Sequence, residues 1–170
     1  MITVYHRYVL QRPIGWESVN KAGADALFRD PNDKGTTVGV TVAPTRLASL
    51  PQFGSVQEVG EKLLAAEKAK VRRHDKAHLC RHQWKQESTL SVLLLAQQQR
   101  VAAVGVPVYE YEYELDSTRG RKRVLNSVAV RGGKLYILNA VTKCAKDGQC
   151  NEDVVAELRR VMNTFELNAD

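Results

Sequence analysis

Apolar and polar residues alternate along two stretches of the sequence in the way expected of half-buried β-strands. Residues 36–45, TTVGVTVAPT, place Val38, Val40 and Val42 on one side of an extended chain. Residues 106–117, VPVYEYEYELDS, alternate tyrosine with glutamate in the same manner. Other stretches rich in β-branched and aromatic residues are also expected to be strands: 2–10, 24–30, 88–99, 122–130 and 134–143.

The pattern changes to a helical period twice. Ser55 and Glu58 form an S-x-x-E capping box, which predicts the start of a helix at this point. Its apolar residues recur on one face, and the helix is expected to continue through residues 65–70 into a basic segment. Residues 151–167 form a second amphipathic pattern with acidic residues at its start, which predicts a helix over the whole stretch. The apolar positions are Val56, Val59, Leu63 and Ala66 in the first helix, and Val154, Val155, Leu158, Val161, Met162 and Phe165 in the second.

Turn residues join several of the expected strands into hairpins. Residues 117–120, STRG, and the pair Gly132-Gly133 each separate two strands that follow one another directly. Hairpins produce antiparallel pairs, so the predicted fold class is α+β, an antiparallel β-sheet flanked by helices. Residues 12–20 read as a turn, within which Trp16 is expected to anchor the core.

Length and composition agree with a soluble globular protein. The chain has 170 residues, 44% of them hydrophobic, which is enough for a single domain spanning 1–170. The apolar runs, such as VLLLA at 92–96, are much shorter than the roughly 20 residues of a membrane span. The first residues lack the layout of a targeting peptide, so we expect a protein that works where it is made or whose targeting segment is missing from this chain.

The net charge of +6 is concentrated in one segment. Residues 71–86, VRRHDKAHLCRHQWKQ, hold five arginines and lysines against one aspartate, a net of +4. The remaining net charge is small. A nucleic-acid-binding domain, by contrast, spreads its positive charge over a whole face. Nucleic acid is therefore not an expected partner.

The tyrosine–glutamate strand carries a prediction of its own. Tyrosines are expected to face inward, and the glutamates to lie opposite cations of the returning strand, where each such pair contributes about 0.2–1 kcal/mol. We therefore interpret this hairpin as a structural element in which opposite charges compensate one another. Its exposed turn, with Arg119, Arg121, Lys122 and Arg123, is predicted to be the edge that docks on a partner.

Residues 111–140, YEYELDSTRGRKRVLNSVAVRGGKLYILNA, resemble the signature region of the PsbP family, the extrinsic proteins of the photosystem II oxygen-evolving complex. The chain is more similar to the PsbP-domain proteins of the thylakoid lumen than to PsbP itself. The resemblance extends through residues 15–67, 87–96 and 154–167, about nine tenths of the chain.

This resemblance implies an α-β-α sandwich and a non-enzymatic accessory protein of the chloroplast thylakoid lumen. Such a protein is peripheral to the membrane and assists assembly or stabilisation of photosystem II or another thylakoid complex. The resemblance allows calcium as a cofactor. It also allows a role in retaining calcium and chloride at the manganese cluster. PsbP has a mobile extension before its first strand, whereas this chain begins almost at that strand, so ion retention is not carried over.

The basic segment is a second departure from the family, whose members connect the flanking elements more directly. It is either a lineage-specific loop or non-coding sequence retained by a gene-model error. His74, His78 and His82 recur at a spacing of four, with Cys80 between them, and a helix would place the histidines on one face. The outer two would lie roughly 12 Å apart, so two neighbouring histidines are the most that could share one zinc or copper ion. A solvated basic helix end, a loop or a site for an anionic partner are the alternatives.

The other cysteines, Cys144 and Cys150, bracket a polar loop. In an oxidising compartment they could form a disulfide worth roughly 2 kcal/mol, and in a reducing one they would be free thiols. Catalysis is not predicted. No nucleophile lies in a recognisable base-bearing motif, and no glycine-rich phosphate loop is present.

Overall fold

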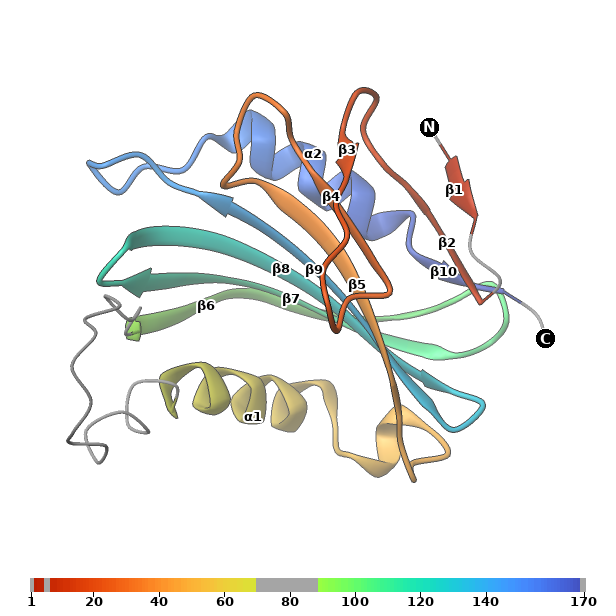
Figure 1. The fold of residues 1–170 in the computed structure, drawn as a ribbon. Helices are drawn as coiled ribbons and strands as arrows, with labels where there is room; N and C mark the ends of the chain where they lie inside the picture. The colour runs from red at the N-terminus through yellow and green to blue at the C-terminus, as the bar shows by residue number, and fades with distance from the viewer. Residues whose placement is uncertain (1, 5–6, 70–88, 169–170) are drawn as a thin grey trace, which may run out of the picture.

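Two helices cover opposite faces of one antiparallel sheet (Figure 1). The computed structural model describes residues 2–4, 7–69 and 89–168. Helix α1 (Val56–Ala69) lies on one face of the sheet and helix α2 (Glu152–Asn163) on the other. This arrangement confirms the predicted α+β class and its α-β-α layering.

The sheet has seven strands in the order β3-β4-β5-β9-β8-β7-β6, and all neighbours are antiparallel. A second sheet has the order β1-β2-β10, and a 3-10 turn, η1, precedes α1. The bounds are β1 (Ile2–Val4), β2 (Tyr8–Gln11), β3 (Glu17–Ser18), β4 (Ala26–Arg29), β5 (Thr37–Pro44), η1 (Leu50–Gln52), β6 (Thr89–Val101), β7 (Pro107–Ser117), β8 (Gly120–Arg131), β9 (Lys134–Lys143) and β10 (Glu166–Leu167).

The central strands follow the hairpins that the sequence predicts. Ser117 lies opposite Gly120 in the β7–β8 hairpin, and Arg131 lies opposite Lys134 in the β8–β9 hairpin. Gly132 and Gly133 between the latter have φ angles of 55° and 68°. A primed two-residue turn requires positive φ at both positions, so the predicted turn type is confirmed.

The smaller sheet corrects two predictions. Residues 2–10 were expected to form one strand, but β1 and β2 are two strands that pair with each other. The second helix was expected to reach residue 167, but α2 ends at Asn163 and residues 166–167 form β10 beside β2. The hydroxyl of Thr164 accepts a hydrogen bond from the Gln11 backbone N–H at 2.9 Å, so pairing with β2 replaces the last helical turn.

Each face of the large sheet has its own core. On the α2 side, Val38 and Val40 of β5 are fully buried with Leu158 of α2 and Phe165, and Trp16 joins the same cluster as predicted. On the α1 side, the tyrosines of β7 pack with Val59 of α1 and Leu50 of η1. Both helix starts are capped through side chains: Glu58 and Ser55 bond reciprocally as the capping box predicts, and Asn151 caps α2.

Candidate docking site at the end of the sheet

Strand β7 turns its glutamates toward the α2 side, where Glu110 and Glu112 are buried and Glu114 is half-buried. Glu110 is only 1% exposed and accepts hydrogen bonds from Arg100 Nε at 2.7 Å and Gln98 Nε2 at 2.6 Å. Arg100 also bonds to the Phe165 carbonyl and, at 2.7 Å, to Glu166. One arginine of β6 therefore neutralises a buried carboxylate and fastens the segment after α2 to the sheet.

Glu112 receives two arginines. Arg159 of α2 donates Nε and Nη2 to its two oxygens at 2.7 and 2.6 Å, and Arg123 of β8 donates Nη1 at 2.7 Å. Burial by itself raises the pKa of Glu112, but the hydrogen bonds and charges of Arg159 and Arg123 outweigh it, and the pKa is lowered. The pKa of Arg159 is raised by the same contact. The pair stays ionised and ties α2 to β7.

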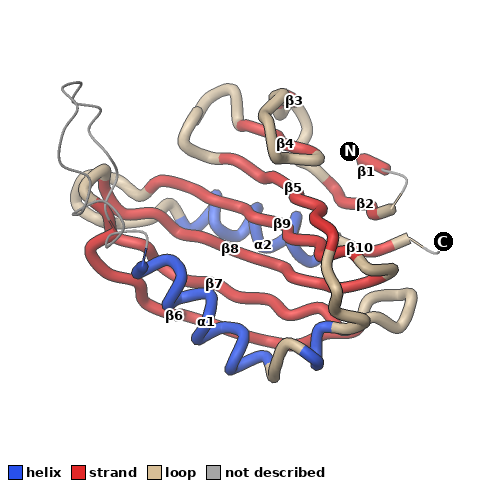
Figure 2. The backbone as a smooth tube through the Cα atoms, turned by 60° about the horizontal axis from the view of Figure 1, so that its bottom comes forward, coloured by secondary structure: helices blue, strands red, loops and turns tan. Residues whose placement is uncertain are grey.

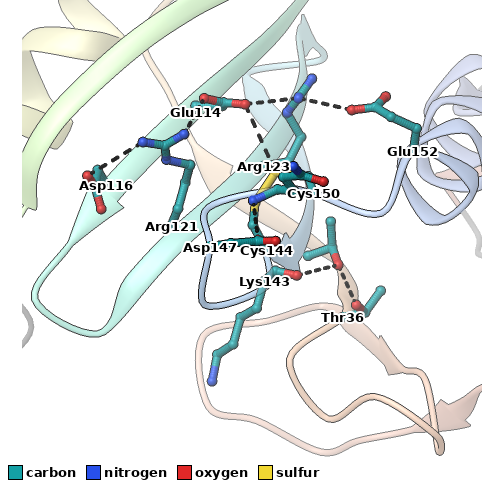
Figure 3. The surroundings of a disulfide bond; sticks show 12 residues. Thr36, Glu114, Asp116, Arg121, Arg123, Lys143, Cys144, Asp147, Cys150 and Glu152 are labelled. Carbon is teal, nitrogen blue, oxygen red and sulfur yellow. Dashed lines mark hydrogen bonds and ion pairs between the residues drawn. A yellow bond between two sulfur atoms is a disulfide. The ribbon is translucent and has the colours of Figure 1, made fainter.

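The network continues to the tip of the β7–β8 hairpin (Figure 3). Arg123 also bonds to Glu114 at 2.9 Å and to Glu152 of α2 at 3.2 Å. Arg121 lies within 3.8 Å of Glu114 and 4.0 Å of Asp116. Glu112 and Glu114 pair with Arg123 of the returning strand as predicted, but Glu110 pairs with Arg100 of β6 and Lys122 lies opposite Leu115.

A disulfide loop lies against the same tip. Cys144, just after β9, is joined to Cys150, just before α2, and the Cys144 N–H donates to the Arg121 carbonyl at 2.9 Å. Gly148 has a φ of 86°, and a Cβ there would lie 3.4 Å from the guanidinium carbon of Arg121. The positive φ of this turn favours glycine, and the guanidinium of Arg121 lies in contact distance of it, so the loop packs on the hairpin beside the start of α2.

The structure places the four predicted docking cations differently from one another. Arg119 is exposed at the turn, and the side chain of Arg121 is 41% exposed. Lys122 is half-buried on the α1 side of β8. Arg123 is only 11% exposed, because its guanidinium is enclosed by the carboxylates of β7 and α2. Arg119 and Arg121 are therefore the cations of this group best placed to meet a partner, and docking itself stays a prediction.

The predicted metal site, His74, His78, His82 and Cys80, lies outside the described residues. Within the ranges that the structure describes, no group of three or more histidine, cysteine or acidic side chains is placed to hold a metal ion. In the same ranges, no helix is long and apolar enough to cross a membrane.

Sequence reasoning missed several members of the network, among them Arg100, Arg159 and Glu152. Arg159 lies in a helical pattern where a charge is normally solvated, and Arg100 lies near the end of β6, 10 residues before its partner Glu110. The alternation in β7 predicted where the glutamates lie, but it did not predict which arginines would contact them. Unexplained carboxylates on the side of a strand opposite its aromatic residues are the signal that could have prompted a search for distant arginines.

Comparison with known proteins identifies the family. Residues 4–167 match the PsbP family model, and the chain belongs to the PsbP family. It is 37% identical over 160 residues to PsbP domain-containing protein 2, chloroplastic, of Arabidopsis thaliana. That alignment covers 94% of this chain, which spans only 62% of the length of the relative.

The fold is shared with a solved structure. The solution structure of cyanobacterial PsbP (CyanoP) from Synechocystis sp. PCC 6803 superimposes with a TM-score of 0.66 at 19% identity. The match covers 95% of this chain and 86% of that one. The predicted family and fold are thus both confirmed.

Proposed function

We infer that this protein is a non-enzymatic extrinsic accessory protein of a photosynthetic complex, assisting its assembly or stabilisation in the chloroplast thylakoid lumen. Family membership over residues 4–167 is the observation that carries this proposal. A relative whose name describes it as chloroplastic supports the compartment. The partner that the family resemblance favours first is photosystem II.

The geometry suggests how such a protein would dock. The hairpin tip, the disulfide loop and the start of α2 form one surface with fixed positions, so little conformational freedom is lost when a partner binds. Arg119 and Arg121 offer guanidinium groups at the rim, where charge steers association and sets specificity. The proposed partner surface is therefore acidic.

The experiment is co-migration of the tagged protein with native complexes solubilised from thylakoid membranes. We expect it to migrate with a photosystem, and Arg119→Glu to weaken that association at least several-fold. Arg46→Glu is the matched control, because Arg46 is exposed near the opposite end of the sheet, just after β5. Circular dichroism would verify that both variants are folded. A wild-type protein that migrates alone in every preparation would refute the accessory role, whereas equal effects of the two variants would refute only the docking edge.

A further inference from the structure

Helix α1 covers only part of its face of the sheet. It packs over β6 and β7, while β8 and β9 lie beside it with less cover (Figure 2). The hydroxyls of Tyr109 and Tyr111 donate to the carbonyls of Gly54 and Val56 at 3.1 and 2.8 Å and hold the helix start over β7. The lack of a side chain at Gly60 lets α1 approach closely, since a Cβ there would lie 2.8 Å from the Tyr111 ring.

This off-centre position leaves a cavity of about 360 Å³ between α1, the segment around η1 and strands β8 and β9. Its volume is within the roughly 300–1,000 Å³ range of sites for small molecules. The walls are almost entirely apolar, and the sheet contributes Val128, Leu135 and Ile137 to them. Those side chains are only partly buried, so an apolar ligand would remove further apolar surface from water.

Two of the polar groups around the cavity already have partners. The Tyr111 hydroxyl donates to Val56, and the Thr45 hydroxyl accepts from the Leu47 N–H at 3.2 Å. Lys62, in contrast, carries a positive charge. Its ammonium donates to the Phe53 carbonyl at 2.8 Å and lies 4.5 Å from the centre of the Phe53 ring, at an exposed position of α1. An ammonium has three donors, so this geometry leaves capacity for an anionic group at the cavity.

We propose that this cavity is a binding site for a small amphiphile with an apolar chain and a single carboxylate, such as a medium-chain fatty acid. The chain lies between α1 and the partly buried side chains of β8 and β9, and the carboxylate pairs with Lys62. Charge complementarity selects the anionic head, and the apolar walls select the chain. The inference is independent of the function proposed above, because it uses the α1 face and not the hairpin tip.

The test is isothermal titration calorimetry of the full chain with dodecanoate below its micelle concentration. We expect saturable binding of one equivalent and much weaker binding of hexanoate, which fills less of the cavity. Dodecyltrimethylammonium, with the same chain and the opposite charge, is expected not to bind. Lys62→Met should weaken dodecanoate binding about tenfold, which corresponds to about 1.4 kcal/mol.

Matched variants separate the site from non-specific adsorption. Lys68→Met removes an exposed cation from the same helix outside the cavity and should leave affinity unchanged. Ala66→Phe places a ring at the cavity from an exposed position, where it should block binding without harming the fold. Absence of saturable binding would overturn the proposal, as would equal binding of both headgroups or equal effects of Lys62→Met and Lys68→Met. Failure of this titration would leave the photosystem association untouched.

Vesicles distinguish a free carboxylate from a membrane lipid. Sedimentation with phosphatidylglycerol vesicles should show no dependence on Lys62 if the ligand is a free amphiphile. Vesicle binding that needs Lys62, together with no response to dodecanoate, would overturn the free carboxylate as the ligand.

Discussion

Strand β7 presents tyrosines to α1 and glutamates to the α2 side, and the two helices contact it in different ways. On the α2 side, Arg100, Arg123 and Arg159 bond to buried or half-buried carboxylates at distances of 2.6 to 2.9 Å, and Arg159 ties the helix to the sheet. On the α1 side, two tyrosine hydroxyls hold only the helix start, and a cavity remains beside it. Specific charged atom pairs therefore help to position α2, whereas α1 rests on the sheet largely through apolar side chains.

The largest expected effect tests the glutamate side. Arg100→Met leaves Glu110 buried with only Gln98 and Ser127 as partners, and removes the bonds to Phe165 and Glu166. We expect a loss of about 3–5 kcal/mol in the free energy of unfolding, measured by urea denaturation. Changing Glu110 to Leu in the same protein should restore part of it, because no unpaired charge is then buried. A loss below about 1 kcal/mol would show that the contact behaves like a surface pair.

The second prediction uses the lowered pKa of Glu112. Glu112→Gln should cost about 2–3 kcal/mol at pH 7, since charge-assisted hydrogen bonds to two arginines become neutral ones. A folded-state pKa below the unfolded value gives stability that is present above about pH 4.3 and is lost as the pH falls through the folded pKa. The difference between wild type and variant should therefore shrink in acid. Glu157→Gln, which neutralises a carboxylate elsewhere on α2, is the matched control for the change of charge.

The disulfide loop comes next. Replacing Cys144 and Cys150 with serine should lower the free energy of unfolding by about 2 kcal/mol, because the unfolded chain loses a short cross-linked ring. Reduction of the wild-type protein should lower its free energy of unfolding by a similar amount. If reduction changes the wild type and the double variant equally, the loop does not contribute in this way.

Gly60 tests the tyrosine side. An exposed helical Gly→Ala change normally stabilises by about 0.5–1 kcal/mol. At Gly60 the new methyl group would meet the Tyr111 ring, and we expect a loss of about 1–2 kcal/mol through overpacking. Denaturant midpoints give the sign of the change in stability, and a loss would show that the methyl group overpacks against Tyr111. A gain would mean that α1 shifts easily on this face.

The smallest effect should come from a pair outside both cores. Glu17 of β3 and Arg29 of β4 lie 3.4 Å apart on neighbouring strands, and both side chains are substantially exposed. Glu17→Gln should change stability by less than about 0.5 kcal/mol. A larger change would mean that exposed pairs rank with the buried arginine contacts and would weaken the contrast between the two faces of β7.

The sequence by itself determined the class of the fold and the direction of many side chains. Alternation placed Val38 and Val40 on one face, and Tyr109 and Tyr111 on the same side of β7, because successive residues of a strand point to opposite faces. The capping box at Ser55 and the glycine turn at 132–133 were also predicted correctly, because their geometry depends only on residues a few positions apart. The family was also readable, since its motifs are contiguous stretches of sequence.

Only the tertiary structure decided how distant elements meet. Arg159 reaches Glu112 across 47 positions of the chain, and Arg100 reaches Glu166 across 66, and neither pairing follows from local pattern. Tertiary contacts also set the ends of some elements. Glu166 and Leu167 form a strand instead of the expected last helical turn, because their backbone pairs with β2. Local periodicity fixes which way a side chain points from its own element. The cavity beside α1 depends instead on where the helix lies over the sheet, and that position results from contacts between residues far apart in sequence.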